Sequence, residues 1–168
     1  MFIEMKVAGI TIDPFSNTPI VILKDLQGKT ALPIWIGILE ASAIATELGD
    51  VKPPRPMTHD LFKNILEDLK VKVVKIEVTD LKDNTFFATI YLELSNKTFT
   101  IDARPSDAIA LALRTDSPIY VNDKVVEESR SVNLKKDDKL LNEATNEEQK
   151  WREILENLTP EDFGKYKM

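Results

Sequence analysis

The sequence of 168 residues contains no cysteine and only one histidine. Without cysteine there is no disulfide, no thiolate metal site and no thiol nucleophile. One histidine leaves too few ligands for a zinc site. The P-loop, the G-x-G-x-x-G fingerprint and the nucleophile elbow are also missing. These absences exclude the common catalytic motifs and direct attention to carboxylates, arginines and the single imidazole.

Long apolar runs and excess positive charge are also absent. No apolar stretch approaches the roughly 20 residues that cross a bilayer. The N-terminus, MFIEMKVAGITI, has a glutamate where a signal peptide carries basic residues, so we expect a cytoplasmic protein with no membrane partner. The net charge of −6 disfavours broad non-specific binding to nucleic acid, which depends on Lys and Arg. A nucleic-acid partner would need arginines or helix ends aimed at one site.

The composition, 43% hydrophobic and 30% charged, is typical of one soluble domain with a real core. We place that domain at residues 1–130. The stretch after it is charged and poor in large apolar residues, which predicts a linker over 131–148. Residues 149–168 contain Trp151, Ile154, Leu155 and Leu158 and are predicted to form a peripheral C-terminal helix that docks on the core, on another subunit or on nothing.

Hydrophobic periodicity predicts strands first, with helices inserted between antiparallel runs, which indicates an α+β fold with two to three packed helices. Thr58 and Ser106 are the expected N-caps of two helices, and Gly49 the expected C′ residue of another. The predicted strands are 2–12, 19–26, 30–37, 71–81, 86–94, 98–103 and 117–121, with KVVEES (124–129) as a weaker one; the predicted helices are 38–48, 58–70 and 106–114.

The segment IDARPSDAIALALR, residues 101–114, joins a strand to an alanine-rich helix. Alternation places Asp102 and Arg104 on one face of the strand, close enough for an ion pair. Asp107 lies in the first turn of the helix, where a carboxylate is stabilised by the helix dipole. One interpretation is a structural junction held by a salt bridge and a cap. The other is an anion site, because a guanidinium beside helix-start N–H groups binds phosphate.

An earlier segment, PPRPMTHDLFKNIL, also places Arg-Pro before a helix start. Arg55 lies in a stiff proline-rich loop, from which its side chain is able to reach the same cleft. His59 stands at an exposed helix end, where it can titrate and act as general acid or base. Asp60 is either a first-turn acid that stabilises the helix or a ligand for a divalent cation.

Glu40 opens another alanine-rich helix directly after a strand and a glycine. If it faces a cleft, it can join Asp60, Asp102 or Asp107 in holding Mg²⁺ or Mn²⁺, which prefer oxygen ligands. The alternative is that Glu40 is solvated. Nothing in the sequence points to an organic cofactor.

Three segments together resemble the bifunctional nuclease domain family over about residues 2–130: LPIWIGILEASAIATEL, PPRPMTHDLFKNILEDL and IDARPSDAIALALRTDSPIYV. The resemblance implies an α/β roll-like domain on a mixed, mainly antiparallel sheet, usually self-associating, so we expect a homo-oligomer. It also implies a nuclease that cleaves RNA and DNA.

The leading hypothesis is a metal-assisted phosphodiesterase of low sequence specificity. Its predicted catalytic residues are His59, Asp60 and Glu40, and its predicted metal ligands are Glu40, Asp102 and Asp107. Arg55, Arg104 and Ser106 are the predicted phosphate-binding residues. A metal-free variant would use His59 as base, with the arginines supplying the electrostatic stabilisation.

Two alternatives remain open. In one, the chain is a non-enzymatic, oligomeric module that binds a phosphate, a nucleotide or a partner's carboxylate through exposed arginines. In the other, both Arg-Pro segments are architectural, and Arg55 and Arg104 are buried in ion pairs.

Overall fold

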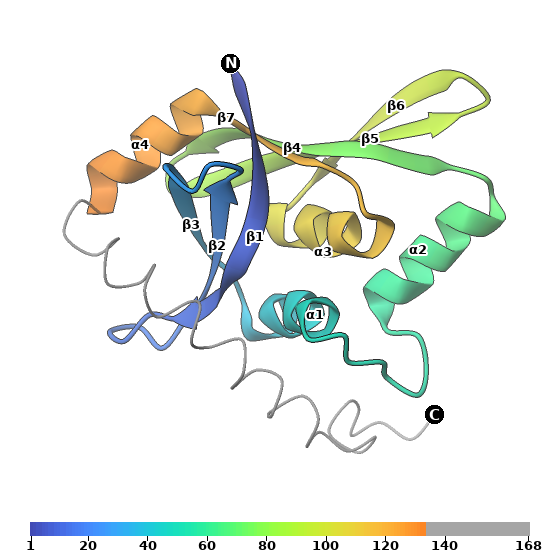
Figure 1. The fold of residues 1–168 in the computed structure, drawn as a ribbon, viewed down its shortest axis with the longest axis horizontal. Helices are drawn as coiled ribbons and strands as arrows, with labels where there is room; N and C mark the ends of the chain where they lie inside the picture. Colours follow the sequence, from blue (N-terminus) through green and yellow to red (C-terminus); the bar gives the residue numbers. More distant parts are fainter. Residues whose placement is uncertain (134–168) are drawn as a thin grey trace.

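The computed structural model describes residues 1–133, in which seven strands form one sheet and four helices pack around it (Figure 1). In chain order the elements are β1 (Phe2–Ile12), β2 (Pro19–Asp25), β3 (Ala31–Trp35), α1 (Ile38–Leu48), α2 (Thr58–Asp68), β4 (Lys72–Lys82), β5 (Thr85–Leu94), β6 (Lys97–Ala103), α3 (Pro105–Thr115), β7 (Ile119–Asn122) and α4 (Asp123–Asn133).

The sheet runs in the order β3-β2-β1-β7-β4-β5-β6. All neighbouring strands are antiparallel except β4 and β7, which are parallel. The α+β class with a mixed, mainly antiparallel sheet is therefore confirmed. Strands β4, β5 and β6, all predicted from the sequence, form an antiparallel meander.

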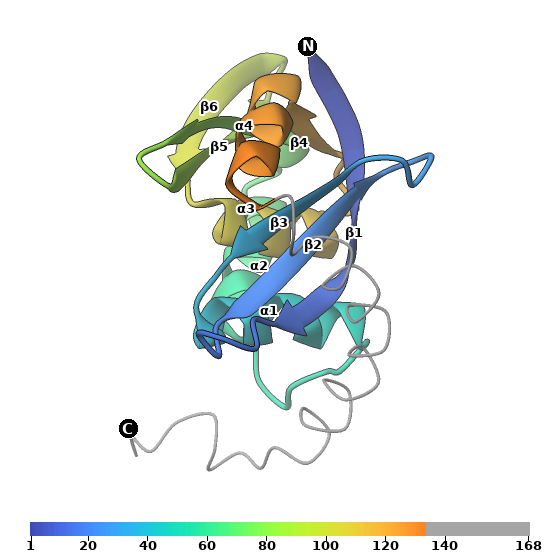
Figure 2. The same ribbon diagram turned by 90° about the vertical axis from the view of Figure 1, so that its left-hand side faces the viewer.

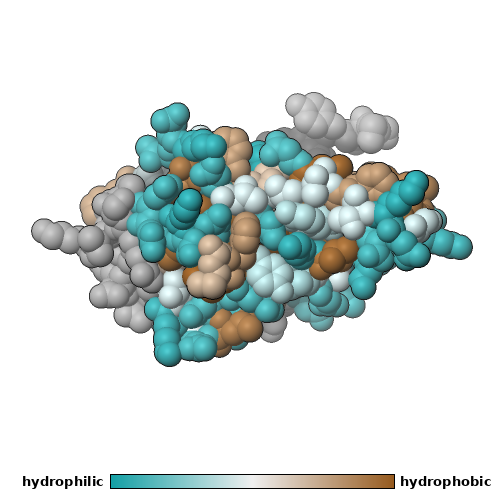
Figure 3. Space-filling model, turned by 90° about the horizontal axis from the view of Figure 1, so that it is seen from above, coloured by the Kyte–Doolittle hydropathy of each residue, from teal (hydrophilic) through white to brown (hydrophobic). Residues whose placement is uncertain are grey.

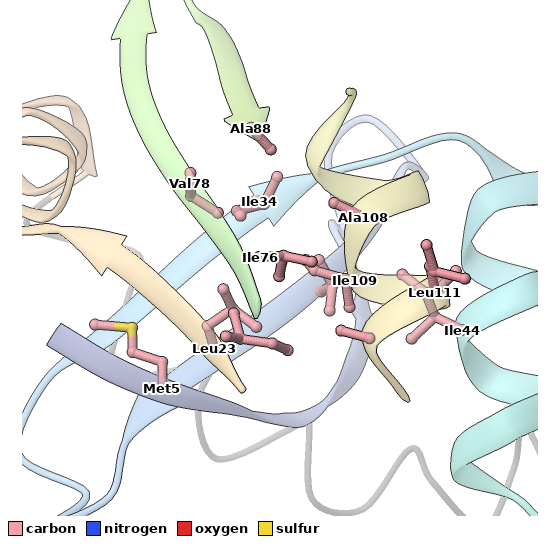
Figure 4. Packing of buried hydrophobic residues seen from close by; sticks show 14 of the residues in the cluster. Met5, Leu23, Ile34, Ile44, Ile76, Val78, Ala88, Ala108, Ile109 and Leu111 are labelled. Atoms are coloured by element: carbon pink, nitrogen blue, oxygen red, sulfur yellow. The ribbon is translucent and has the colours of Figure 1, made fainter. Parts of the chain in front are cut away.

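Helix α3 lies at the centre of the domain, between the sheet and α1 (Figures 1 and 4). Its residues from Ala108 to Ala112 are at most 1% exposed. Ile109 and Leu111 fill the core, together with Ile44 of α1 and Ile76 of β4. Alanines on the remaining sides of α3 allow close approach of its neighbours, which keeps the packing dense. The central position of this helix follows from its composition.

One predicted strand is wrong. The segment KVVEES belongs to α4, not to a strand. Val125 and Val126 are 1% and 3% exposed, and Ser129, 8% exposed, lies on the same helical face. A short apolar run of this kind fits both periods, and the packing of α4 against β3, β4 and β7 decides for helix.

The predicted caps also need correction. Met57 and Arg104, not Thr58 and Ser106, are the N-cap residues of α2 and α3. Pro105 occupies the first position of α3, which suits its fixed φ and missing N–H and moves the cap back by two residues. Gly49 is a right-handed C-cap with φ −82°, and Asp50 takes the left-handed conformation at φ 50°.

Most of the C-terminal part for which a linker and a helix are predicted lies outside the described residues. Helix α4 continues to Asn133, three residues into the predicted linker. Residues 134–148 of that linker and the helix predicted at 149–168 lie outside the described residues. Within residues 1–133, no helix is long and apolar enough to cross a membrane.

The face of the molecule seen from above carries hydrophilic residues with small hydrophobic patches between them (Figure 3). On the outward side of β4, Glu77 accepts hydrogen bonds from Lys75 Nζ (2.6 Å) and Tyr91 OH (2.7 Å). The ammonium group of Lys75 also lies 4.4 Å from the centre of the Tyr91 ring. This polar cluster lets Glu77 be 5% exposed while its charge stays compensated.

Asp13 ties the β1–β2 turn to β3. Its carboxylate accepts hydrogen bonds from Phe15 N–H (2.9 Å) and Trp35 Nε1–H (3.0 Å). These bonds, the one from Phe15 foremost, lower the pKa of Asp13 from 3.8 to about 2. The ionised form is therefore stabilised in the folded protein.

We predict an acid-labile contribution to stability from Asp13. A carboxyl with a lowered folded pKa stabilises the fold fully above its unfolded value, here 3.8, and the contribution is lost as pH falls towards about 2. Urea unfolding of wild type and Asp13→Asn from pH 2 to 7 measures it. The free-energy difference between the two proteins should shrink across this window. A difference independent of pH would contradict the assignment.

Candidate active site

Four side chains from three separate parts of the chain form one continuous hydrogen-bonded row. His59 Nε2 of α2 lies 3.0 Å from Asp107 Oδ1 of α3. The other oxygen, Asp107 Oδ2, accepts from Arg104 Nε at 2.8 Å. Arg104 Nη1 then donates to Glu40 Oε1 of α1, also at 2.8 Å. The row Glu40–Arg104–Asp107–His59, here called the site row, joins the starts of α1, α2 and α3.

Local sequence explains why these side chains meet at helix starts. Arg104 is the N-cap of α3, and Asp107 lies three residues later, so the two face each other across the first turn. Glu40 occupies the first turn of α1. Residue Gly37, the N-cap of α1, makes room for it, since a Cβ there would collide with Glu40 Oε2. His59 lies in the first turn of α2, next to α3 in the fold.

The two ends of the site row are sheltered from solvent, and Arg104 between them is exposed. The side chains of His59 and Glu40 are 16% and 21% exposed, whereas that of Arg104 is 65% exposed. Burial alone would raise the pKa of Asp107, but the hydrogen bonds from Arg104 and His59 outweigh it and hold that pKa below its ordinary value. Asp107 is therefore ionised at neutral pH.

Ionised Asp107 determines which nitrogen of the neutral imidazole carries the proton. A carboxylate only accepts, so His59 Nε2 must donate to it. The lone pair is then on Nδ1, which has no hydrogen bond to any side chain within residues 1–133. A carboxylate that fixes the tautomer and stabilises the imidazolium is the arrangement of a general base. His59 and the exposed Arg104 guanidinium thus share Asp107 as a hydrogen-bond partner.

A second ion pair, which the sequence analysis missed, holds α2 against α3. Arg114 Nε donates to Asp60 Oδ1 at 2.6 Å, and Arg114 Nη1 donates to the Ala110 carbonyl at 2.9 Å. The Arg114 side chain is only 3% exposed. Asp60 Oδ2 also accepts from Met57 N–H at 2.9 Å. Although burial raises the pKa of Asp60, Arg114 and the Met57 N–H lower it by more.

Asp60 therefore lies next to His59 in an ion pair with Arg114 and takes part in none of the bonds of the site row. By fixing the first turn of α2 to α3, the Asp60–Arg114 pair sets the separation of His59 and Asp107. The sequence did contain a signal for this pair. Arg114 lies in the last turn of a helix whose other residues are almost all buried. It points to a buried partner, because a buried charge is rarely left unpaired.

Three predicted phosphate or metal residues are not brought into the site row. Arg55 is exposed and takes part in none of its bonds. Ser106 is 6% exposed inside the first turn of α3. In the pairing of β6 with β5, Asp102 lies opposite Thr89, and the preceding residue, Ile101, lies opposite buried Ile90. Alternation therefore directs Asp102 to the other face of the sheet, and the predicted Asp102–Arg104 ion pair is wrong.

The donor set does not fit a divalent metal ion. Within residues 1–133, no group of three or more histidine, aspartate or glutamate side chains is arranged to hold one. Of the three predicted ligands, Glu40 and Asp107 are bridged by the Arg104 guanidinium, which stands where a cation between them would lie. Both carboxylates are paired with this arginine instead.

We predict that Gly37→Ala acts at a distance on Arg104. The added Cβ meets Glu40 Oε2, the far end of a flexible side chain, so the carboxylate shifts and the backbone is retained. Gly37 has φ −75°, which alanine adopts without strain. The loss of stability should be about 1 kcal/mol, the usual difference between good and poor N-cap residues. Thermal melting checks this, and a crystal structure with the Glu40–Arg104 bond intact would contradict it.

The fold and the site row define an α+β domain with an arginine- and histidine-containing site at converging helix starts. The sequence profile of the bifunctional nuclease domain matches residues 21–133. The chain belongs to this family, as its three motif segments predicted.

Individual relatives agree with this assignment. An uncharacterized protein of Mycobacterium tuberculosis is 36% identical over 162 residues, which cover 95% of this chain and 97% of the relative. Bifunctional nuclease 1 of Arabidopsis thaliana is 28% identical over 113 residues, 64% of this chain and 34% of the plant protein. Bifunctional nuclease 2 of the same plant is 30% identical over 107 residues, 61% and 32%. The matched region thus spans about a third of the plant nucleases.

Proposed function

We propose that this protein is a nuclease, a phosphodiesterase that acts on RNA or DNA with low sequence specificity. The observation that carries the proposal is the site row, in which an aspartate-bound imidazole lies beside an exposed arginine. Membership of the bifunctional nuclease domain family and the names of the plant relatives support the same reaction class.

In this proposal His59 is the general base. Its Nδ1 takes the proton from the attacking oxygen, which is the ribose 2′-hydroxyl in RNA or a water molecule with either nucleic acid. Asp107 stabilises the imidazolium that forms. The protonated imidazole then gives a proton to the leaving oxygen. His59 thus takes up one proton and releases one, and it is neutral again at the end of the reaction.

Arg104 is the proposed phosphate clamp. Its guanidinium is exposed, and its N–H groups lie where they can stabilise the extra negative charge of the transition state. With His59 neutral, Glu40 (−1), Arg104 (+1) and Asp107 (−1) sum to −1. This negative sum disfavours tight phosphate binding in the ground state, which agrees with transient rather than tight association with nucleic acid. Arg55, four residues before His59, is proposed to make an additional phosphate contact.

The decisive experiment is cleavage of labelled single-stranded RNA and DNA by highly purified wild type, His59→Ala and Arg104→Ala. Each protein is first shown to be folded by circular dichroism. Cleavage by wild type that is lost in both variants supports the proposal. Equal cleavage by all three would show that the activity belongs to another site or a contaminant.

The same assay tests the predicted metal ion. Parallel reactions contain Mg²⁺, Mn²⁺ or EDTA. Because the described residues do not gather the three predicted ligands, the proposed proton transfers use side chains alone, and metal dependence remains a prediction. Cleavage that persists in EDTA supports the route through His59. Dependence on Mg²⁺ or Mn²⁺ would show that donors other than the described carboxylate set are recruited.

The second candidate function is a phosphate- or nucleotide-binding module without catalysis. The exposure of Arg104 favours it over the purely architectural alternative, which required this arginine to be buried. Absence of cleavage combined with Arg104-dependent binding of inorganic phosphate or a mononucleotide would establish this function.

We also propose that the protein is a homo-oligomer, with α2 in the interface. Leu61, Phe62, Ile65 and Leu69 are 39–63% exposed along this helix. Within residues 1–133, β6 is bonded only to β5, so its outer backbone edge is available to a second copy. Clusters of exposed apolar side chains are typical of interaction sites.

Ile65→Asp is predicted to shift the protein towards monomer, because a charge in an apolar interface remains unpaired. Light scattering after size exclusion measures the mass. Leu26→Asp, at a leucine 60% exposed in the β2–β3 turn, is the matched control and should leave the mass unchanged. A wild type that is monomeric at all concentrations would contradict the interface.

A further inference from the structure

Strand β2 is apolar on both of its faces. Val21 and Leu23 point into the main core, while Ile20 and Ile22 alternate to the opposite side and are 0% exposed. They form a separate cluster with Ala8, Ala31 and Trp35, here called the outer β1–β3 face. A strand that is hydrophobic on both sides is typical of one covered on both sides.

The described helices do not supply the second cover. Ile44 of α1, Ile109 of α3 and Val125 of α4 all belong to the main core cluster, on the other side of β2. No helix of residues 1–133 contributes to the outer cluster. Figure 2 shows β1, β2 and β3 in front of α1 and α3, which agrees with helices on the inner side of these strands.

We infer that the C-terminal segment of the same chain, residues 149–158, packs as an amphipathic helix on the outer β1–β3 face. Trp151, Ile154, Leu155 and Leu158 have the spacing i, i+3, i+4 and i+7, which places all four on one helical stripe. A ten-residue helix is about 15 Å long. That is sufficient to cross three strands spaced about 4.8 Å apart.

Chain connectivity permits this placement. Helix α4 packs against β3, the edge strand next to β2, and ends at Asn133. Fifteen residues, 134–148, then separate it from the amphipathic segment. An extended chain of this length reaches about 50 Å, more than the dimensions of the sheet require.

A second copy of the domain is the alternative occupant of this face, because α2 carries an exposed apolar stripe of its own. The concentration dependence of the test below separates the two occupants.

The two tryptophans of the chain allow a direct test, since Trp35 lies on the face and Trp151 in the segment. In full-length Trp35→Phe, Trp151 is the only tryptophan. We expect its emission to be blue-shifted relative to the unfolded protein and protected from iodide. Adding Leu155→Asp should shift the emission to the unfolded position. Asn157→Asp, which adds the same charge away from the apolar stripe, should not.

Emission of Trp151 at the unfolded position in native buffer would overturn the inference. Protection that appears only as protein concentration rises would also overturn it, because the segment would then be protected by association between copies. Because Trp35→Phe loses the hydrogen bond to Asp13, fluorine NMR of otherwise wild-type protein containing 5-fluorotryptophan gives the same reading without that change. Trp151→Phe assigns the resonance, and a Trp151 shift equal to that in denaturant would contradict docking.

Discussion

His59→Ala is expected to lower the rate of nucleic-acid cleavage by about 10²- to 10⁴-fold, the usual contribution of a positioned general acid or base. The reason is that Nδ1 of this imidazole is the proposed proton acceptor, and Asp107, 3.0 Å from Nε2, fixes its tautomer. Initial rates on labelled RNA and DNA measure the change, and circular dichroism confirms that the variant is folded.

Lys63→Ala is the matched control for this prediction. Lys63 is on the same helix, one turn away, and its ammonium lies 3.5 Å from Glu67 in an exposed pair. Its removal should leave cleavage unchanged. A His59→Ala protein that cleaves at the wild-type rate would show that the imidazole has no part in the reaction.

Arg114→Met is expected to lower the free energy of unfolding by about 3–5 kcal/mol, the cost of removing one partner from a buried ion pair. The substitution leaves Asp60 without its guanidinium and removes the side-chain donor to the Ala110 carbonyl. A loss of this size is a large part of the roughly 5–15 kcal/mol that holds most domains together. Urea unfolding of both proteins at pH 7 gives the difference.

The surface pair Lys82–Asp80 supplies the comparison, because the Lys82 side chain is 69% exposed. Lys82→Met should cost far less than Arg114→Met, because an exposed pair contributes little to stability. The double variant Asp60→Asn/Arg114→Met should be more stable than the sum of its single losses predicts, since neither charge is then left alone. If Arg114→Met and Lys82→Met lower the free energy of unfolding equally, the Asp60–Arg114 ion pair contributes little to stability.

The elements of the fold were largely predictable because their signals are local. Alternation identified the strands, and the alanine-rich segments identified the central helices. For KVVEES the sequence did not distinguish a strand from a helix, because a run of two valines fits both equally well. The N-caps were displaced for a related reason. Pro105 is itself favourable as the first helical residue, which makes Arg104 and not Ser106 the residue at the boundary.

The site was predictable only in part. Glu40, His59, Arg104 and Asp107 were all candidates, because each stands at a helix start. Their pairing was not predicted: 48 residues separate His59 from Asp107, and 64 separate Glu40 from Arg104. Such partners depend on how the helices pack, not on local pattern. The predicted Asp102–Arg104 ion pair was wrong because alternation within β6 fixes the side of Asp102, whereas Arg104 has already left the strand.

The resulting picture differs from the metal-centred hypothesis in its electrostatics. Carboxylates expected to gather around a cation are instead paired with arginines, Glu40 and Asp107 with Arg104 and Asp60 with Arg114. Arg104 is exposed in the site row, whereas Arg114 is buried between α2 and α3. This chain thus has one exposed Arg–Asp pair in the site row and a second, more buried pair between α2 and α3.

The most direct test of the central claim compares the pH dependence of cleavage with the titration of His59. Because the chain has one histidine, its imidazole resonances in NMR are unambiguous. We predict that the pKa of the rate profile equals the pKa measured for His59, and that both move together in Asp107→Asn. A rate profile whose pKa differs from that of His59, or stays fixed while the His59 titration moves, would contradict the assignment of the site row as a nuclease active site.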